Sequence, residues 1–311
     1  MMRDFPRIFE QTLNTPLRRN VVLSDYSSFR IGGRARYFFE ARELSEIKAA
    51  IDLCRRQAMP FYLIGSGTNL LFDDAGFRGV IIRNCCRGIS PRASRDIEAL
   101  SGTSLSEVVD FAAGRGLQGM EFLAGIPGTV GGAVFGNAGA FGRSIGELLA
   151  EAVLFDFQGN ETSVPPEYFG FSYRRSRLRV EHATLLQAVF HLTPGEEGPI
   201  RARMDEYLGQ RRLKHPPRET ACAGCYFKNP VLADGSKVSA GKVLEEAGAQ
   251  AERSGDAAVS AQHSNFIVNE GRARAKDVLR LASKLKEKVR ELYGYELEEE
   301  VIYLPAGASM P

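Results

Sequence analysis

The sequence lacks the features of a secreted, membrane or nucleic-acid-binding protein. Its first residues, Met-Met-Arg-Asp-Phe-Pro-Arg, contain no apolar run of signal-peptide length. The uncharged stretch 122–142 includes Pro127, Asn137 and many glycines, which make a poor membrane helix. The net charge is only +2, so a broad basic face for nucleic acid is excluded, although local basic clusters suit a small anionic ligand. We expect a cytoplasmic monomer with no membrane or nucleic-acid partner.

Cysteine is also scarce and odd in number, which argues against a disulfide framework in a chain of this kind. Cys222 and Cys225 form a C-x-x-C pair, but a zinc site needs two more ligands and no second pair exists. The following segment 226–230 does not read as the helix of a thioredoxin-like motif. No metal site is expected. The five cysteines are Cys54, Cys85, Cys86, Cys222 and Cys225.

Glycine is abundant in two places. Seven glycines fall between Gly125 and Gly142, and a second loop reads Gly65-Ser-Gly-Thr-Asn-Leu70. Neither loop has the lysine of a P-loop, and the first lacks the third glycine and the immediate helix of a Rossmann fingerprint. The alternative of tight structural turns stays open for either loop alone. Together they favour a large nucleotide whose diphosphate is held by main-chain N–H groups.

The hydrophobic periodicity along the chain predicts an α+β protein in three lobes. The 32 glycines and 14 prolines supply turns and ends for its helices and strands. Helices are expected at 43–58, 105–114 and 200–214, and along the apolar stripe Val278, Leu281, Leu285, Val289 and Leu292, which Gly294 ends. Strands are expected at 35–40, 61–64, 80–82, 152–157, 184–192 and 296–304. The predicted units are an N-terminal arm 1–20, lobes at 21–85 and 86–196, and a last lobe 197–311 beyond a linker at 194–199.

Six motifs in this order resemble the UDP-N-acetylenolpyruvoylglucosamine reductase family. Arg30-Ile-Gly-Gly33, the loop 65–71, and 125–133 with Asn137-Ala-Gly139 are similar to its flavin loops. Tyr173-Arg174, the segment 224–230 and Leu297-Glu-Glu-Glu-Val301 are similar to its active-site segments. The matches extend over about residues 28–301, and only jointly are they specific.

The resemblance implies a two-lobe FAD-binding domain of the vanillyl-alcohol-oxidase type, followed by a C-terminal substrate-binding lobe. It also implies non-covalent FAD, NADPH as co-substrate, and reduction of an enolpyruvyl UDP-sugar to UDP-N-acetylmuramate for peptidoglycan. NADPH and the UDP-sugar would take turns over one flavin face, since no second dinucleotide fingerprint is found. The implied FAD contacts are Arg30, Gly32, Gly65, Ser66, Gly67, Thr68, Asn69, Leu70, Gly125, Ile126, Pro127, Gly128, Thr129, Gly131, Gly132, Asn137 and Gly139.

Three residues are implied as catalytic while flavin N5 delivers hydride. Arg174 would supply the fixed cation for the developing enolate. Cys225 would donate the proton, and most family members carry serine at this position. A thiol of pKa about 8.5 stays protonated near pH 7. A neighbouring Arg174 would, however, lower that pKa. Glu300 would be protonated or paired with Arg174, and strand alternation puts it on one face with Glu298.

Substrate contacts are implied at Tyr173, Lys214, Asn229 and His263. The chain between Arg174 and Cys225 is too short for the clamping loop of one subgroup, so it is similar to the loop-less type. Candidates to cover the substrate diphosphate are Arg211, Arg212 and Arg218, whereas Arg175, Arg177 and Arg179 are expected to be surface or structural residues. An inhibitory Cys222–Cys225 disulfide under oxidant is a further hypothesis.

Two other functions stay open from the residues. One is a related flavin oxidase or dehydrogenase on another substrate, in which His or Cys often attaches the FAD covalently. The other is a non-catalytic nucleotide-sugar-binding protein, which would carry no flavin.

Overall fold

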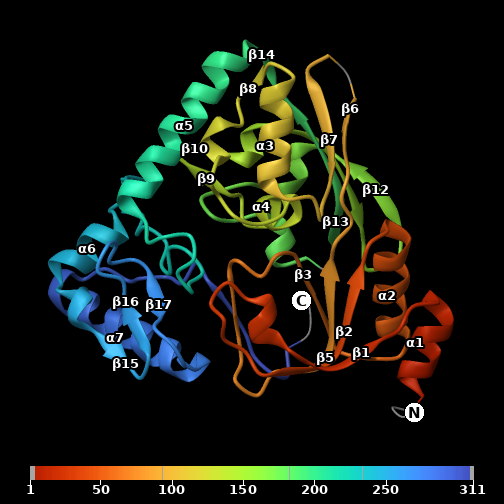
Figure 1. The fold of residues 1–311 in the computed structure, drawn as a ribbon, viewed down its shortest axis with the longest axis horizontal. Coiled ribbons are helices and arrows are strands. Elements are labelled where there is room, and N and C mark those ends of the chain that lie inside the picture. The colour runs from red at the N-terminus through yellow and green to blue at the C-terminus, as the bar shows by residue number, and fades with distance from the viewer. Residues whose placement is uncertain (1–3, 93, 182, 233, 309–311) are drawn as a thin grey trace.

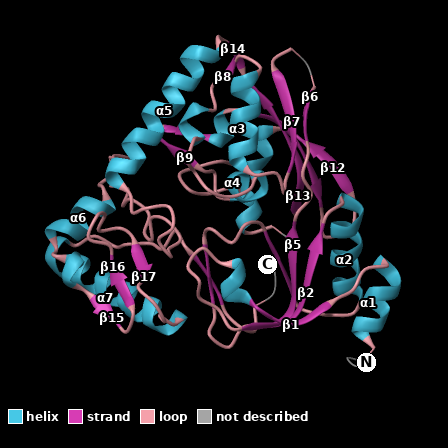
Figure 2. Cartoon of the chain, in the orientation of Figure 1, coloured by secondary structure: helices cyan, strands magenta, loops and turns pink. Residues whose placement is uncertain are grey.

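The computed structural model describes residues 4–92, 94–181, 183–232 and 234–308, which form an α+β fold of three lobes (Figure 1). Helices line the outside of each lobe, and loops fill the centre where the lobes meet (Figure 2). This central region holds both glycine loops and the segments expected to be catalytic.

The first lobe is built on a mixed four-stranded sheet in the order β1-β2-β5-β3. Strand β1 (Arg18–Val22) runs antiparallel to β2 (Arg34–Ala41), while β2, β5 (Phe77–Asn84) and β3 (Phe61–Ile64) are parallel. Helix α2 (Leu44–Arg56) covers one face, because Ile47, Ile51 and Cys54 recur at helical spacing and are fully buried. The predicted strands and helix of this lobe are confirmed.

Residues 5–20 do not form the expected arm. Residues Phe5–Leu13 fold into helix α1, which buries Phe5 and Phe9 in the same core as Ile47 and Ile51 of α2. The ring of Phe9 meets that of Phe39 on β2 edge to face, with centroids 5.1 Å apart. The start of the described chain is therefore part of the first lobe, a placement that its short apolar pattern did not reveal.

The second lobe contains an antiparallel five-stranded sheet in the order β12-β11-β13-β7-β6. Helix α3 (Leu105–Gly114) begins at Ser104, whose hydroxyl accepts the N–H of Glu107 at 3.1 Å in a capping box. Helix α4 (Val130–Phe135) lies within the glycine run and is capped by Thr129. The sheet strands are β6 (Ile89–Pro91), β7 (Asp96–Leu100), β11 (Leu149–Phe155), β12 (Glu161–Val164) and β13 (Thr184–His191), beside the paired ribbons β8 (Leu117–Gln118) with β14 (Thr193–Pro194) and β9 (Gly139–Ala140) with β10 (Arg143–Ser144).

Helix α5 (Glu197–Lys214) begins three residues before the expected helix, so most of the predicted linker is structured. It buries Ile200 and Met204 in the core of the second lobe. Figure 1 shows α5 running along that lobe down to the third. The expected boundary at 196/197 thus differs from the packing, in which α5 belongs to the second lobe.

The third lobe packs α6 (Ala240–Glu246) and α7 (Ala275–Tyr293) against the sheet β15 (Arg253–Ser254), β16 (Ala257–Val259) and β17 (Ile267–Asn269). Helix α7 buries the predicted stripe except Leu292, which is exposed, and Gly294 ends the helix with a φ of 69°. Its core also takes in Phe29, Ile31 and Leu71 from the first lobe. The two lobes therefore share an apolar interface.

The end of the chain returns to the first lobe. Strand β18 (Ile302–Leu304) pairs in parallel with β4 (Leu70–Phe72), directly after the first glycine loop. The carboxylate of Asp74 accepts the N–H groups of Ala275 (2.8 Å) and Lys276 (3.2 Å) at the start of α7. The predicted strand 296–304 is wrong in its first part, where only an isolated bridge between Glu299 and Phe227 forms.

Candidate functional site

The two glycine loops touch each other across the boundary between the first and second lobes. The hydroxyl of Thr68 donates to the carbonyl of Pro127 at 3.4 Å. A Cβ on Gly65 would lie 2.5 Å from Oγ1 of Thr129, a distance that only glycine allows. Loops 60 residues apart in sequence thus form one surface, as two halves of a single nucleotide site require.

The first loop also presents free hydrogen-bond donors. Within the described ranges, no acceptor pairs with the main-chain N–H groups of residues 66–69. Successive unpaired N–H groups in a turn form an anion-binding concavity, which a diphosphate fills well. This observation fits FAD, whose diphosphate would be held by the N–H groups of residues 66–69 next to the second loop.

Two predicted FAD residues use their side chains inside the protein instead. Asn69 donates from Nδ2 to the carbonyl of Glu300 at 3.1 Å and accepts the N–H of Ile302 on its own carbonyl at 3.1 Å. Asn137 donates from Nδ2 to the carbonyl of Ser172 at 2.9 Å. Both amides therefore fix the segments that carry the expected catalytic residues.

Arg30 lies at the edge of this region. Its backbone adopts a left-handed conformation with φ of 55°, and its exposed guanidinium donates to the carbonyl of Glu219 at 3.1 Å. Its contact with FAD stays a prediction.

Tyr173 and Arg174 occupy the tip of a tight turn. Ser172 and Arg175 exchange both main-chain hydrogen bonds at 3.1 Å, which leaves these two residues as the centre of the turn. Arg174 has a φ of 56°, an uncommon conformation for a residue with a side chain. Strain of this kind concentrates at functional sites, where the surrounding structure holds it in place.

Arg174 lies against Glu300, as the ion-pair alternative for this carboxylate predicts. Nε of Arg174 lies 2.8 Å from Oε1 of Glu300, and the two side chains are 23% and 19% exposed. The contact is close, but it lacks the alignment of a hydrogen bond, so the buried Nε–H has no aligned acceptor. The pair joins the turn of the second lobe to the last segment of the third.

Cys225 lies beside this ion pair. The carbonyl of Tyr226, the next residue, accepts the N–H of Glu300 at 2.8 Å. Burial by the surrounding protein, with the charge of Glu300, raises the pKa of the half-buried Cys225 thiol to about 12, although the guanidinium groups of Arg174 and Arg211 act in the opposite direction. The thiol is therefore protonated at neutral pH, which removes the objection that Arg174 would ionise it.

Asn265 fixes the Cys225 segment and was not found from the sequence. Its side chain accepts the N–H of Phe227 at 2.9 Å and donates to the carbonyl of Phe227 at 2.8 Å. Its own carbonyl accepts the N–H of Tyr226 at 2.7 Å. An asparagine that mimics a strand partner has no sequence signature, because its partners lie 38 residues away.

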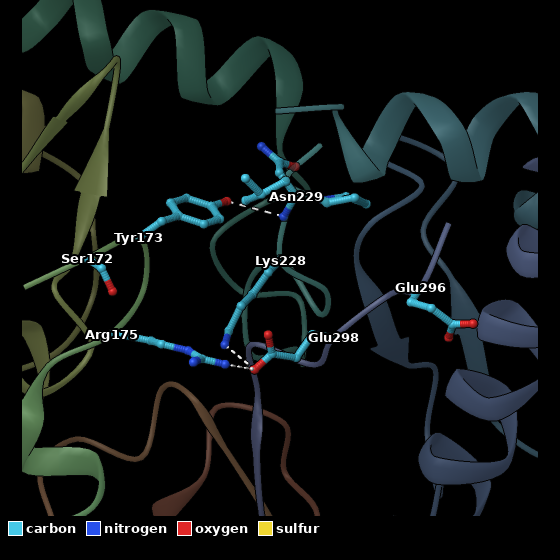
Figure 3. Close-up of a pocket in the computed structure, with 9 residues that line it drawn as sticks. Ser172, Tyr173, Arg175, Lys228, Asn229, Glu296 and Glu298 are labelled. Atoms are coloured by element: carbon cyan, nitrogen blue, oxygen red, sulfur yellow. Dashed lines mark hydrogen bonds and ion pairs between the residues drawn. The ribbon is translucent and has the colours of Figure 1, made fainter. Parts of the chain in front are cut away.

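The three glutamates before Val301 alternate as predicted. Glu298 pairs with Lys228 and Arg175 on the side of Glu300, whereas Glu299 pairs with Lys286 of α7 at 3.0 Å. Figure 3 shows Lys228 and Arg175 both directed at Glu298.

Tyr173 and Asn229, two predicted substrate contacts, lie together on a pocket of about 340 Å³ (Figure 3). The Tyr173 hydroxyl accepts the N–H of Asn229 at 3.2 Å, and the Asn229 side chain accepts the N–H of Ala240 at 2.9 Å. Nζ of Lys237 lies 4.0 Å from the centre of the Tyr173 ring. This pocket adjoins the Arg174 turn but is not lined by the glycine loops.

Lys214 and His263, the other two, lie in a different neighbourhood at the end of α5. Lys214 is exposed there, and the ring of the next residue, His215, is 5.7 Å from that of His263. Nδ1 of His263 accepts the N–H of Asn265 at 3.1 Å, and burial lowers the pKa of His263, so the ring is neutral and positions the loop before Asn265. Among the residues described, no hydrogen bond joins this pair directly to Tyr173 or Asn229.

Of the arginines suggested for the substrate diphosphate, Arg211 lies nearest to the site. It donates to the carbonyl of Phe122 at 3.2 Å, and its charge acts on Cys225. Arg212 and Arg218 are exposed.

Arg179, expected to be a surface or structural residue, does not lie on the open surface. Its guanidinium is half-buried, lies 5.3 Å from the ring centre of Phe135, and interacts electrostatically with Glu300. Arg175 and Arg177 are exposed as predicted.

The described ranges hold no cluster of His, Cys, Asp and Glu able to bind a metal ion. Within the same ranges, none of the helices combines the length and the apolar character needed to cross a bilayer. All five cysteines are free thiols.

Comparisons with known proteins agree with this site. Residues 35–156 match a family model described as FAD binding domain, and residues 215–304 match one described as the C-terminal domain of UDP-N-acetylenolpyruvoylglucosamine reductase. The reductase of Clostridium novyi is 36% identical over 286 residues, covering 92% of this chain and 91% of the relative. Reductase 2 of Symbiobacterium thermophilum is 38% identical over 288 residues, with the same coverage of 92% and 91%.

A solved structure shares the fold. The chain superimposes on the reductase of Thermus caldophilus with a TM-score of 0.77 and 35% identity, covering 93% of this chain and 99% of that one. The predicted fold class, an FAD-binding domain followed by a C-terminal α+β lobe, is confirmed. The chain therefore belongs to the UDP-N-acetylenolpyruvoylglucosamine reductase family, and it is an oxidoreductase whose cofactor is FAD.

Proposed function

We propose that this protein uses NADPH to reduce the enolpyruvyl group of UDP-N-acetyl-3-O-(1-carboxyvinyl)-glucosamine, giving UDP-N-acetylmuramate for peptidoglycan synthesis. One observation carries the proposal. Arg174 and Glu300, 126 residues apart, form an ion pair at 2.8 Å beside the segment of Cys225 and next to the glycine loops. This arrangement supplies the cation and the proton donor that addition across a conjugated double bond needs.

The chemistry supplied by bound FAD is the transfer of a hydride, taken from NADPH, to the terminal carbon of the double bond. Negative charge then develops on the substrate carboxylate and the adjacent carbon. Arg174 meets that charge with a guanidinium held in advance by the turn and by Glu300, so little reorganisation is needed during the reaction. Glu300 thus acts on the cation that the substrate carboxylate approaches, and it does not itself move a proton in this scheme.

Cys225 delivers the proton to the carbon next to the carboxylate. Its raised pKa keeps the thiol protonated, and the thiol is still a stronger acid than the serine hydroxyl common in the family. The main-chain bonds of Tyr226 and Phe227 to Asn265 keep Cys225 at one position relative to Glu300. The resulting enzyme adds hydride and proton in a fixed geometry.

The electron donor and the UDP-sugar share one face of the flavin in this proposal, and the reaction is ping-pong. Initial rates measured at several NADPH concentrations should give parallel double-reciprocal lines, and converging lines would contradict it. We expect the protein to be a cytoplasmic monomer; sedimentation of the purified protein tests the oligomeric state.

The function is tested by the colour of the purified enzyme. NADPH should remove the flavin absorbance near 450 nm, at a rate on the order of the turnover rate. The enolpyruvyl UDP-sugar should then restore this absorbance. A flavin that NADPH reduces but the UDP-sugar does not reoxidise would disprove the substrate.

The role of Cys225 is tested by a matched pair of substitutions. Cys225→Ser should keep substantial turnover, whereas Cys225→Ala should slow reoxidation by the UDP-sugar on the order of 100-fold or more, the usual contribution of a general acid. Reduction by NADPH should be unchanged in both. Normal reoxidation in Cys225→Ala would exclude the thiol as proton donor.

A further inference from the structure

Arg179 occupies a place where all three lobes meet. Its guanidinium lies over the Phe135 ring at the end of α4, at 5.3 Å from the ring centre. It interacts electrostatically with Tyr62 on β3, and with Glu300 and Glu298 from the last segment of the chain. It therefore lies where the three lobes come together, on the side of the Arg174–Glu300 ion pair.

The cation of Arg179 is not neutralised by the protein. Nε is buried without a hydrogen-bond partner, and no carboxylate lies within 4.0 Å of the guanidinium in the described part of the chain. The two nearest acids are already engaged, since Glu300 pairs with Arg174 and Glu298 pairs with Lys228 and Arg175. Burial lowers the pKa of Arg179, because removing a charged guanidinium from water costs free energy.

A half-buried guanidinium whose Nε has no hydrogen-bond partner carries a desolvation cost, and an anion bound beside it offsets that cost. The FAD diphosphate already has the free N–H groups of residues 66–69 on the first loop. A second anion forms on the cofactor itself, because the isoalloxazine ring gains one negative charge when it takes up two electrons and one proton. This ring must lie within reach of Arg174, Glu300 and Cys225 to react with the substrate.

We propose that Arg179 is a cofactor-facing residue whose guanidinium stabilises the negative charge of the reduced isoalloxazine ring. The proposal rests on FAD as the cofactor and on the placement of its ring beside the catalytic ion pair. Arg179 then favours uptake of electrons by the cofactor, whatever the second substrate. The oxidised ring is neutral, so FAD affinity in the resting enzyme depends on Arg179 much less.

The experiment is a redox titration of the FAD-loaded enzyme without NADPH or UDP-sugar, with electrons from xanthine and xanthine oxidase and an indicator dye. Arg179→Met should disfavour the reduced form about tenfold, which lowers the two-electron midpoint potential by about 30 mV. Arg179→Lys should keep most of the wild-type potential because it keeps the charge. Arg177→Met removes an exposed arginine two residues away and should change nothing.

FAD affinity, measured by flavin fluorescence on dilution, separates the alternatives. An unchanged potential in Arg179→Met would overturn the proposal. A loss of FAD with an unchanged potential in the remaining holoenzyme would assign Arg179 to the diphosphate and also overturn it. Arg179→Gln provides a second neutral substitute, and failure of both neutral variants to fold would make the residue structural. Because neither substrate is present, an error in the proposed reaction would leave this result intact.

Discussion

Alkylation of Cys225 by iodoacetamide should be about a thousandfold slower at pH 8 than alkylation of an ordinary thiol. Only the thiolate reacts, and burial beside Glu300 raises the pKa of Cys225 from 9.0 to about 12. At pH 8 the thiolate fraction is then ~10⁻⁴, compared with ~10⁻¹ for a thiol of pKa 9.0. Cys225 as a whole residue is only partly buried.

The decisive readout is the shape of the pH profile, because access to the thiol changes the rate but not the apparent pKa. The rate should rise tenfold per pH unit through pH 10 without levelling, since the folded-state pKa lies above that range. The holoenzyme would be assayed as a Cys222→Ala variant, with the alkylated peptide identified by mass spectrometry. The same chain unfolded in guanidinium provides the control and should level off near pH 9.0.

A profile that levels off at or below pH 9 in the folded enzyme would refute the reasoning. It would mean that the guanidinium groups of Arg174 and Arg211 outweigh burial, and that Cys225 is a thiolate at alkaline pH. Turnover should then fall along the same limb, because a thiolate cannot donate the proton. A protonated thiol instead predicts that reoxidation by the UDP-sugar stays constant to pH 10.

Two stability predictions concern residues that the fold places unexpectedly. Phe5→Ala should lower the free energy of unfolding by about 3–5 kcal/mol, measured by urea denaturation, because the Phe5 ring is buried in the first-lobe core. The control Arg7→Ala, at an exposed position, should change that free energy by less than about 0.5 kcal/mol. Equal effects of the two substitutions would show that α1 does not pack on the core. Asn265→Ala should lower the free energy of unfolding by about 2–5 kcal/mol, because it leaves two buried main-chain groups of Phe227 unpaired. Gln262→Ala removes an exposed side chain from the same loop and should change this free energy little. A small loss of stability in Asn265→Ala would mean that water replaces the amide.

The proposed active site depends on contacts between the lobes more than on any single lobe. Arg174 comes from the second lobe, Glu300 and Cys225 from the third, and Asn69 of the first lobe donates to the carbonyl of Glu300. The pairing of β18 with β4 and the capping of α7 by Asp74 fix the third lobe to the first. These contacts explain how residues far apart in sequence hold one geometry.

The sequence by itself determined the features that depend on residues close together along the chain. Helical spacing located α2 and α7. The density of glycine marked the loops 65–70 and 125–142, which the structure brings into contact. The sequence also predicted correctly that Glu299 and Glu300 point to opposite sides of the chain. Successive side chains of an extended segment do so whether or not the segment joins a sheet. Motif resemblance supplied Arg174, Cys225 and Glu300 as a set, although nothing local placed them together.

Only the tertiary structure decided which neighbours each side chain meets. It buried Phe5 in one core with α2, turned the amide of Asn69 toward the carbonyl of Glu300, and left Nε of Arg179 without a hydrogen-bond partner. It also set the protonation of Cys225, since the pKa of a thiol depends on burial and on charges contributed by distant segments. Such effects arise from long-range packing, which leaves no periodic or local trace in the chain.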